Sequence, residues 1–489
     1  MHKPLMHKPL MHKPLITALA LATGLFVSGC AMLEPRVPEA APAIAAEWPL
    51  PPTTSAGSAS VPSDTSAGVL PATAGPVADI GWRDFFVDPR LEQLIGLSLQ
   101  NNRDLRVAVL NVERARSQYR IQRADRMPSL AVGADLVRTG GDAPVTETYS
   151  ASLGLAQFEL DLFGRVRNLS HAALQRFFAT EESQRSAQLA LIAEVANTYL
   201  TLSADRELLR ISEATLATQE TSFELTRKRH ELGALSALEL NQSRTVVETA
   251  RSDVARFAGQ VARDTNALTL LVGATIDPAL LPEAFEPQVS GLAALPAGLP
   301  SDVLLRRPDV MAAEHQLLAA NANIGAARAA FFPSISLTGS VGSASNELSG
   351  LFESGNGVWR FMPQISLPIF QGGRLRANLG MATADRDIAL AQYEKSIQAG
   401  FREVADALAL SRTLADQRAA QEALLEAASR SHELSKARHD AGLDSYLVLL
   451  DAQRTLYAAQ QSLVATLLAE QANRVTLYKV LGGGWVESS

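Results

Sequence analysis

Cysteine is almost absent from this chain of 489 residues, which contains only Cys30. One cysteine excludes a disulfide bond within the chain. Long apolar runs are absent too. After the N-terminal segment, no stretch reaches the roughly 18 uninterrupted apolar residues that a transmembrane helix requires. If the protein crosses a membrane, we therefore expect it to do so as β-strands, the other structure that satisfies its backbone hydrogen bonds in lipid.

Motifs for catalysis, metal binding and nucleotide binding are also missing. The sequence has no His-Glu-x-x-His, no phosphate loop ending in Gly-Lys-Ser/Thr, no Gly-x-Ser-x-Gly elbow and no metal-spaced set of Cys and His. The run Gly482-Gly483-Gly484 follows a predicted helix, whereas a phosphate-binding loop precedes one. We therefore assign no catalytic residue and expect no enzyme activity, no metal and no cofactor. The energy for any transport must come from a partner.

Basic residues are outnumbered, with 44 Lys and Arg against 51 Asp and Glu, a formal net charge of −7. Removal of residues 1–29, which carry three lysines and no acid, would leave −10. A nucleic-acid-binding protein needs a basic face, so this balance argues against a nucleic acid partner. It is compatible with an acidic lumen that attracts cations.

The N-terminus predicts an export signal. Lysines precede an apolar run from Leu15 to Val27, which is a signal-peptide pattern. The run ends in Ser28-Gly29-Cys30, which looks like a bacterial lipobox, so we predict a signal peptide over residues 1–29 and a covalent lipid on Cys30. Ala31, where an Asp would favour the inner membrane, favours the outer membrane. The alternative is an ordinary signal peptide with a chance cysteine. The repeated MHKPL leaves three candidate start codons, Met1, Met6 and Met11.

A unit of roughly 200 residues occurs twice in the same order. The aligned segments include Gly164-Arg165 with Gly373-Arg374, Glu194-Val195-Ala196 with Glu403-Val404-Ala405, and Gly233 with Gly442. A repeat of this size predicts one supersecondary unit built twice.

Each repeat predicts a helix, a β-hairpin and a long helical hairpin. Residues 90–126 read as one helix that ends before Pro128. Alternating apolar and small or polar residues then predict hairpins at about 129–162 and about 334–370. Strands of this length with modest amphipathy suit an outer-membrane β-barrel. The alternative is a soluble hairpin packed on the helices.

The helical hairpins are unusually long. Residues 165–232 contain neither proline nor glycine, which predicts roughly 100 Å of helix. A helix of that length needs partners along all of it, so we expect coiled-coil packing. The predicted segments are a lipidated Pro/Ala/Ser-rich tether (30–81), a first repeat (82–273) with its tip at Gly233, a linker (274–302), a second repeat (303–482) with its tip at Gly442, and a tail (483–489).

Several motifs resemble one family. Residues 441–454, AGLDSYLVLLDAQR, look like its tip and ascending helix, and Leu481-Gly482-Gly483-Gly484-Trp485 looks like the C-terminal end of its lipidated branch. The two Arg-x-x-x-Gly turns and Leu304-Leu305-Arg306-Arg307-Pro308-Asp309 also fit. Over residues 82–485 the chain therefore resembles the outer-membrane factors, the TolC-type exit ducts of tripartite efflux pumps and secretion systems.

The resemblance implies a mainly α fold and a homotrimer. Three copies would form a 12-stranded outer-membrane β-barrel continuous with an α-helical barrel in the periplasm. The implied function is passive export of small toxic molecules or drugs, loaded by a periplasmic adaptor and an inner-membrane transporter. The lipidated branch favours drug efflux over protein secretion, and the cargo and the identity of the adaptor stay open.

The resemblance also implies site residues. Family members close at the periplasmic tip, and the matching positions here are Leu447 and Asp451, four residues apart on one helix face. In a trimer they would form an apolar plug and an acidic ring. The alternatives are a coiled-coil core leucine and a solvated acid. The equivalents in the first repeat are Leu238 and Gln242, so the chain lacks a second acid at the paired position, and the number of charged rings stays open.

The two tip turns are the expected contacts for the adaptor. The residues concerned are Arg229, Gly233, Arg438 and Gly442. The glycines free the backbone to turn, and the arginines suit a helix C-terminus, so capping alone is an alternative explanation for them. His230 and His439 stand beside the arginines as possible pH sensors or simple surface residues.

Two other classes of protein compete with the duct. A periplasmic adaptor lipoprotein would need one helical hairpin flanked by β-rich domains, whereas this chain has two hairpins in tandem. A membrane-tethered coiled-coil scaffold would leave the alternating strands without a role.

Overall fold

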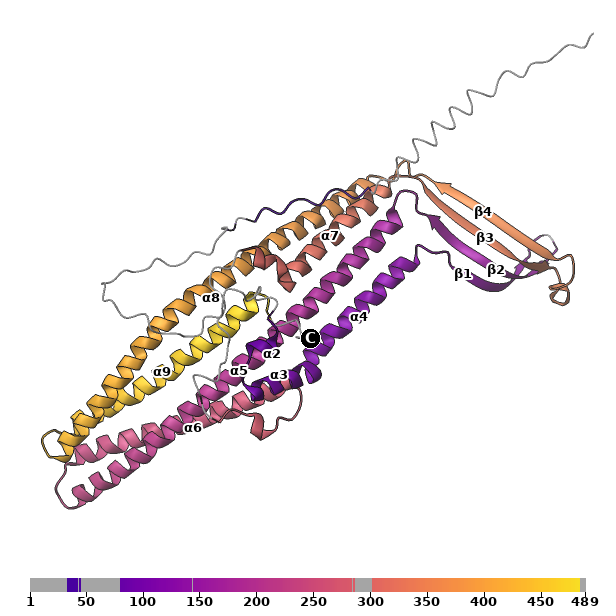
Figure 1. Ribbon diagram of the computed structural model, residues 1–489. Coiled ribbons are helices and arrows are strands. Elements are labelled where there is room, and N and C mark those ends of the chain that lie inside the picture. Colours follow the sequence, from indigo (N-terminus) through magenta and orange to yellow (C-terminus); the bar gives the residue numbers. More distant parts are fainter. Residues whose placement is uncertain are drawn as a thin grey trace, which may run out of the picture. The chain divides into compact units, whose positions relative to one another are not determined.

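The computed structural model describes residues 33–42, 44, 80–142, 144–283, 285 and 301–483 (Figure 1). The predicted signal peptide, Cys30 and most of the tether and tail lie outside this range. The described residues form two compact units. One contains residues 33–40, Val112–Thr180 and Ala312–Tyr393, and the other contains the remainder. The two longest helices contribute residues to both units.

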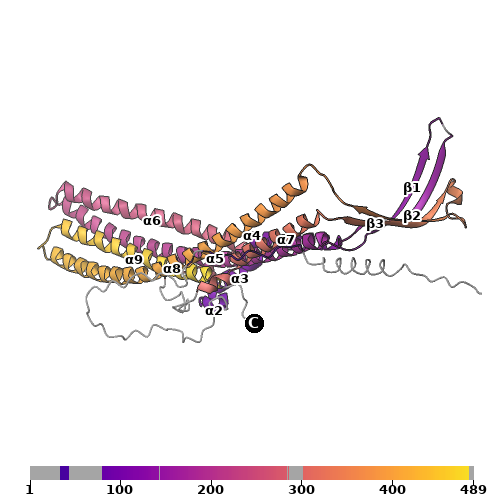
Figure 2. The same ribbon diagram turned by 90° about the horizontal axis from the view of Figure 1, so that it is seen from above.

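The same order of elements occurs twice, so the predicted tandem repeat is confirmed. The first repeat contains α2 (Trp82–Phe85), α3 (Pro89–Asn101), α4 (Arg103–Ala124), β1 (Leu130–Thr139), β2 (Thr146–Leu160), α5 (Arg165–Glu231) and α6 (Ala237–Val272). The second contains α7 (Pro308–Ala329), β3 (Ser334–Ser345), β4 (Gly357–Ser366), α8 (Arg374–Asp440) and α9 (Tyr446–Val480). Short 3-10 turns lie at Pro278–Leu280, Ser301–Arg306 and Leu348–Gly350. Both α5 and α8 have 67 residues. Figures 1 and 2 show α5 beside α6 and α8 beside α9.

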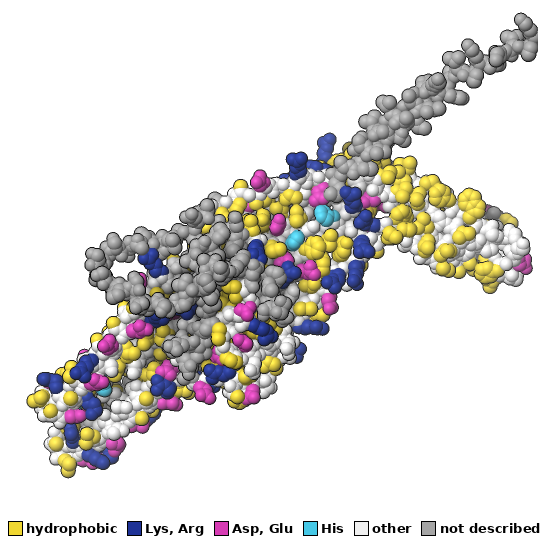
Figure 3. Space-filling model, in the orientation of Figure 1, with side chains coloured by type: hydrophobic (Ala, Val, Ile, Leu, Met, Phe, Trp, Pro, Cys, Tyr) yellow, Lys and Arg dark blue, Asp and Glu magenta, His cyan; other side chains and the backbone are white. Residues whose placement is uncertain are grey.

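The two hairpins join into one antiparallel sheet of order β1-β2-β3-β4. The β2–β3 pairing links the repeats and places Tyr149 opposite Ser345. A bulge interrupts β2 between Leu155 and Phe158, where Gln157 has φ 36°. Such a bulge bends the strand and increases its twist. Hydrophobic side chains cover much of the strands on the face seen in Figure 3. Within the described chain, β1 and β4 each have one unpaired edge.

The expected single helix over residues 90–126 is wrong, because the chain breaks at Asn102 into α3 and α4. Asn102 has extended backbone angles, and its Oδ1 accepts a hydrogen bond from the Leu105 N–H at 2.9 Å, which caps α4. Its Nδ2 donates to the Leu271 carbonyl near the end of α6, also at 2.9 Å. The break therefore allows the Asn102 side chain to bond to α6, a segment that is distant in sequence.

A hydrophobic core in the second unit joins α2 to the end of α9. The ring of Tyr478 in α9 stacks on Phe85 with centroids 3.7 Å apart, and its hydroxyl donates to the Ile80 carbonyl at 2.7 Å. Trp82 and Phe85 in α2 are fully buried. Burial is the main cause that raises the pKa of Tyr478. The last long helix thus completes the packing of the first short one.

Arg307 ties the second repeat together beside this core. Its guanidinium is buried and donates to the Asp309 and Glu403 carboxylates and to the Val480 carbonyl, at 2.8 to 3.0 Å. Burial lowers the pKa of Arg307, but the bonds to the two carboxylates outweigh it and raise the pKa overall. The buried charge is therefore fully paired, which is the condition for tolerating it.

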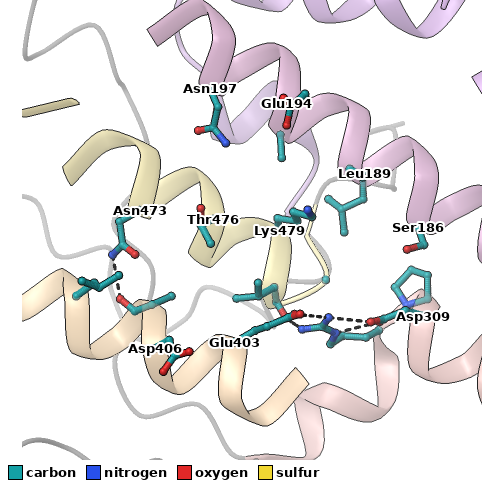
Figure 4. A pocket seen from close by; sticks show the side chains of 18 residues that line it. Ser186, Leu189, Glu194, Asn197, Asp309, Glu403, Asp406, Asn473, Thr476 and Lys479 are labelled. Atoms are coloured by element: carbon teal, nitrogen blue, oxygen red, sulfur yellow. Dashed lines mark hydrogen bonds and ion pairs between the residues drawn. The ribbon is translucent and has the colours of Figure 1, made fainter. Parts of the chain in front are cut away.

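A polar cavity of about 540 Å³ lies next to Arg307 (Figure 4). Its walls come from α5, the start of α7, α8 and α9. They include residues that are equivalent in the two repeats, Glu194 with Glu403 and Asn197 with Asp406. The repeat is therefore visible in the side chains at this level as well as in the backbone.

An acid pair lies at the contact between α5 and α6. Burial raises the pKa of Asp205 to about 6, and a hydrogen bond and charge repulsion from Asp264 act in the same direction. The Asp264 Oδ2 atom is buried without another partner in the described chain. A proton shared by the two carboxyls stabilises this contact at low pH. Its contribution is full below about pH 3.8 and is lost as the pH rises through about 6.

We expect Asp205→Asn to stabilise the protein at pH 8, because it removes the repulsion between two ionised carboxylates. The gain should be about 1 kcal/mol, since the pair is only partly buried, and it should shrink toward pH 5. The measurement is the thermal unfolding midpoint at both pH values. Glu213→Gln, at an exposed acid of α5, is the matched control. An equal gain at both pH values would contradict the shared proton.

Candidate functional site

The two helix tips have the same backbone turn. Gly233 and Gly442 have φ values of 75° and 74°, in the left-handed region. At the first tip the N–H groups of Gly233 and Ala234 donate to the carbonyls of His230 and Arg229. The second tip repeats this pattern at the equivalent positions. Both are Schellman motifs, which satisfy the last carbonyls of α5 and α8 and reverse the chain.

Each tip histidine is bonded to the turn that follows it. His230 Nδ1 lies 2.8 Å from the Leu235 carbonyl oxygen, and His439 Nδ1 lies 3.2 Å from that of Asp444. Because a carbonyl only accepts, Nδ1 carries the proton in both rings. These bonds stabilise the turns, a role of the two histidines that the sequence analysis missed. The sequence indicates this role only through the equal spacing of the histidine and the tip glycine in both repeats.

The two tip arginines differ in their partners. Arg438 donates to both carboxylate oxygens of Asp444, at 2.6 and 2.9 Å. The equivalent of Asp444 in the first repeat is Leu235, and Arg229 forms no ion pair within the described part of the chain. The Arg438 side chain therefore pairs with Asp444 and does not bond to the carbonyl groups at the end of α8. Arg438 is thus paired within its own tip, whereas Arg229 has no such ion pair and only helps, after Lys436, to lower the pKa of Asp440.

The helices that return from the tips also begin differently. Ser236 and Glu239 form a complete capping box at the start of α6. At the start of α9, Ser445 makes no side-chain cap hydrogen bond. Val448, which stands where Glu239 stands in the first repeat, also has no side chain that could bond back to the Ser445 N–H. The start of α9 therefore has fewer local constraints than the start of α6.

The structure places Leu447 and Asp451 together on an exposed face of α9. Leu447 is 59% exposed, and the adjacent residues Leu449 and Leu450 point into the protein and are buried. Asp451 is exposed, and no ion pair to its carboxylate is found among the described residues. The equivalent Leu238 is also exposed, at 68%. Within one chain, these side chains are free to meet other surfaces.

The segment after the predicted lipid site lies against α5 and α7. Asn321 Nδ2 donates to the Pro35 carbonyl at 2.7 Å and to Glu34 Oε1 at 3.3 Å. His171 Nδ1 lies 3.4 Å from Glu34 Oε2. A side chain at Gly325 would approach the Glu34 Cα to 3.1 Å, so glycine makes room for this segment. Part of the predicted Pro/Ala/Ser-rich tether therefore packs against the helices.

The strands meet the helices at a junction of aromatic and charged side chains. Phe163 stacks on Phe332 with centroids 4.7 Å apart, and Arg165 pairs with Glu159.

No helix of the described ranges is long and apolar enough to cross a membrane. In the same ranges, no group of three or more His, Cys, Asp or Glu side chains is placed to hold a metal ion.

The chain matches a family model over most of its length. The model, for outer membrane efflux proteins, covers residues 94–274 and 299–483, which fall in the two repeats. Two Pseudomonas putida proteins, antibiotic efflux pump outer membrane protein ArpC and toluene efflux pump outer membrane protein TtgC, are each 48% identical over 482 residues, covering 96% of both chains.

A solved structure has the same fold. The open state of the MtrE outer membrane channel from Neisseria gonorrhoeae superposes with a TM-score of 0.81 at 38% identity, covering 93% of this chain and 99% of that one. The chain therefore belongs to the outer membrane efflux protein family, whose members are channels and not enzymes.

Proposed function

We propose that this chain is the exit duct of a tripartite efflux pump in the outer membrane. The observation that carries the proposal is the family match, which covers both repeats and so includes both hairpins and both helical tips. A periplasmic adaptor and an inner-membrane transporter load the duct. The duct itself conducts passively.

The open sheet supports assembly from several copies. Every residue of β1 and of β4 is exposed, including Val132 and Trp359. In lipid, the unpaired N–H and C=O groups of two such edges are too costly to leave open. Pairing β4 of one copy with β1 of the next satisfies them. By resemblance to the TolC-type ducts, three copies complete a closed sheet of twelve strands.

Leu447 and Asp451 form the gate of this trimer. Both are exposed on the first turns of α9, and each occurs once per copy. Three leucines at the narrowest point exclude water, and three aspartates repel anions and attract cations. The lack of a side-chain cap at Ser445 suits a helix start that must move.

The two tip turns are the adaptor contact. Arg229 at the first tip, which forms no ion pair among the described residues, and the Arg438–Asp444 pair at the second present different charges to a partner. An adaptor that binds both tips of one chain therefore meets two distinct surfaces. Rigid Schellman turns at Gly233 and Gly442 hold these surfaces in fixed positions.

Small toxic molecules are the proposed cargo. ArpC is named for antibiotic efflux and TtgC for toluene efflux. We propose the same class for this chain, with selection made upstream in the transporter.

The gate is tested by Leu447→Ala together with Asp451→Ser. We expect higher single-channel conductance in planar bilayers and greater antibiotic sensitivity of cells, because the plug and the acidic ring are removed. Leu238→Ala with Gln242→Ser changes the equivalent positions of the first repeat and serves as the matched control. Conductance equal to that of the unaltered protein would exclude these residues from the gate.

The tips are tested by Gly233→Ala and Gly442→Ala. Both positions have open space around them, so the only effect is backbone strain of about 1 kcal/mol at each positive φ. We expect less periplasmic adaptor to co-purify after crosslinking in cells. Gly380→Ala, at a helical glycine that also has open space, should leave the amount unchanged. An equal yield from all variants would contradict a contact at the tips.

The lipid anchor is tested by Cys30→Ser. We expect trimers of unchanged mass by light scattering, because the edges of the sheet and the helices make the assembly, but weaker retention in the outer-membrane fraction. A variant that is monomeric would show that the acyl chain is required for assembly. Full retention of the variant would show that Cys30 carries no anchor.

A further inference from the structure

Arginines gather where the helices meet the strands. Eight of them lie within the last turns of α4 and α7, the first turns of α5 and α8, and the residues beside these ends: Arg120, Arg123, Arg126, Arg165, Arg167, Arg328, Arg374 and Arg376. Only three carboxylates, Asp125, Glu159 and Asp161, lie in the same short segments. Lys and Arg side chains are seen at this end of the helices in Figure 3. We call these eight residues the arginine belt. It is positive in a chain whose net charge is −7.

Most of the belt has no carboxylate partner. Arg123, Arg126, Arg167 and Arg376 are exposed and form no ion pair within the described ranges. Arg328 donates to a backbone carbonyl and Arg374 to a glutamine, which leaves their charges uncompensated. Arg165 alone is paired, with Glu159.

The cations at the opposite ends of the long helices are paired in a different way. Four of them have carboxylate partners: Arg227 with Glu224 and Glu231, Arg430 with Glu433, Lys436 with Asp440, and Arg438 with Asp444. Most belt arginines therefore differ from these four tip cations in lacking a carboxylate partner, although Arg229 at the first tip also has no ion pair among the described residues.

Helix stability explains only part of the belt. Arg123 and Arg328 lie in the last turns of α4 and α7, where the helix dipole favours cations. Arg165, Arg167, Arg374 and Arg376 occupy the first turns of α5 and α8, where the dipole is positive, and neither first turn contains an acid. Cations at this end are unfavourable, whereas an anion there is favourable. Asp161 accepts the Arg167 N–H at 2.7 Å at the start of α5, and the remaining positive charge of the two helix starts attracts negative charge from outside the protein.

An apolar surface borders the belt on the strand side. Ile369 and Phe370, just before α8, are 92% and 88% exposed, and Leu162, just before α5, is also exposed. Leu130, at the start of β1, follows Arg126 by four residues and is exposed as well. An apolar surface followed at once by arginines matches the boundary between lipid tails and phosphate groups in a bilayer.

We propose that the arginine belt binds the phosphate groups of anionic phospholipids in the leaflet that faces the helices. The inference rests on the proposed location in the outer membrane. Guanidinium suits this ligand because its fork of N–H donors matches two phosphate oxygens. The bound lipids fix the depth at which the strands sit. They also supply the negative charge that the chain itself omits at this level.

The test uses the full-length protein in nanodiscs of phosphatidylcholine with a minor share of phosphatidylglycerol. Lipids that stay bound after extraction are counted by native mass spectrometry. We expect phosphatidylglycerol to be enriched over its share in the disc. A variant with four belt arginines changed should lose the enrichment: Arg123→Gln, Arg126→Gln, Arg374→Gln and Arg376→Gln. The affinity for phosphatidylglycerol should fall by about fivefold for each arginine removed.

Two controls separate charge from structure. Arg106→Gln with Arg114→Gln removes two exposed, unpaired arginines of the same helix α4, about 26 and 14 Å from Arg123 along the axis. These changes should leave the enrichment intact. The four belt positions changed to Lys should also keep most of it, because the charge is preserved.

Three results would overturn the inference. They are equal enrichment in the Gln variant and the unaltered protein, no enrichment in an inserted unaltered protein, and retention of lipopolysaccharide in place of phospholipid. Insertion and trimer formation are scored separately by electron microscopy of the same discs. Failure of the unaltered protein to insert would count against the proposed function instead. A Gln variant that inserts and changes only the ion selectivity of the channel would place the belt in the lumen and not at the lipid.

Discussion

The dominant constraint on this protein is that a helix of 67 residues must be covered along its whole length. Neither α5 nor α8 could persist alone, because helical propensity contributes little without tertiary contacts. In the second unit, α6 and α9 provide the cover, and Tyr457 shows how. Its hydroxyl lies 2.8 Å from Ser212 of α5 and donates to Asp253 of α6 at 3.1 Å, so one side chain of α9 holds two other helices. The tight glycine turns follow from the same constraint, because the helix that covers α5 or α8 must reverse direction directly after the tip.

Much of this architecture could be read from the sequence. The absence of proline and glycine over residues 165–232 and the alternating residues after Pro128 and Pro333 are local signals, and both gave the right elements. The break at Asn102 could not be read, because its cause is a hydrogen bond to Leu271, 169 residues away. The acid pair of Asp205 and Asp264 and the docking of Glu34 beside Gly325 also depend on contacts between distant segments. Leu447 and Asp451 were found by resemblance, and the structure adds that they share an exposed face.

The two repeats keep one backbone and vary the side chains that act on it. Both tips have the same Schellman turn and the same histidine bond. However, Asp444 in the second repeat is Leu235 in the first, and Val448 is Glu239. Local backbone geometry is thus shared, whereas charge and capping strength are separate for each tip. A chain built in this way can keep one of its helical hairpins fixed and let the other move without a change of fold.

Because Tyr478 stacks on Phe85, the packing around α2 can be completed only after the end of α9 has been exported. Trp82 and Phe85 in α2 and the adjoining Phe86 lie near residue 80, but the ring that packs on Phe85 and Phe86 belongs to Tyr478 in the last turn of α9. During that interval nearly 400 residues pass, and three large aromatic side chains stay uncovered in an aqueous compartment. Exposed aromatic surface of this kind invites aggregation. The newly exported chain should therefore depend on periplasmic chaperones until its C-terminus arrives. A chain that lacks only the final turns of α9 should stay bound to those chaperones.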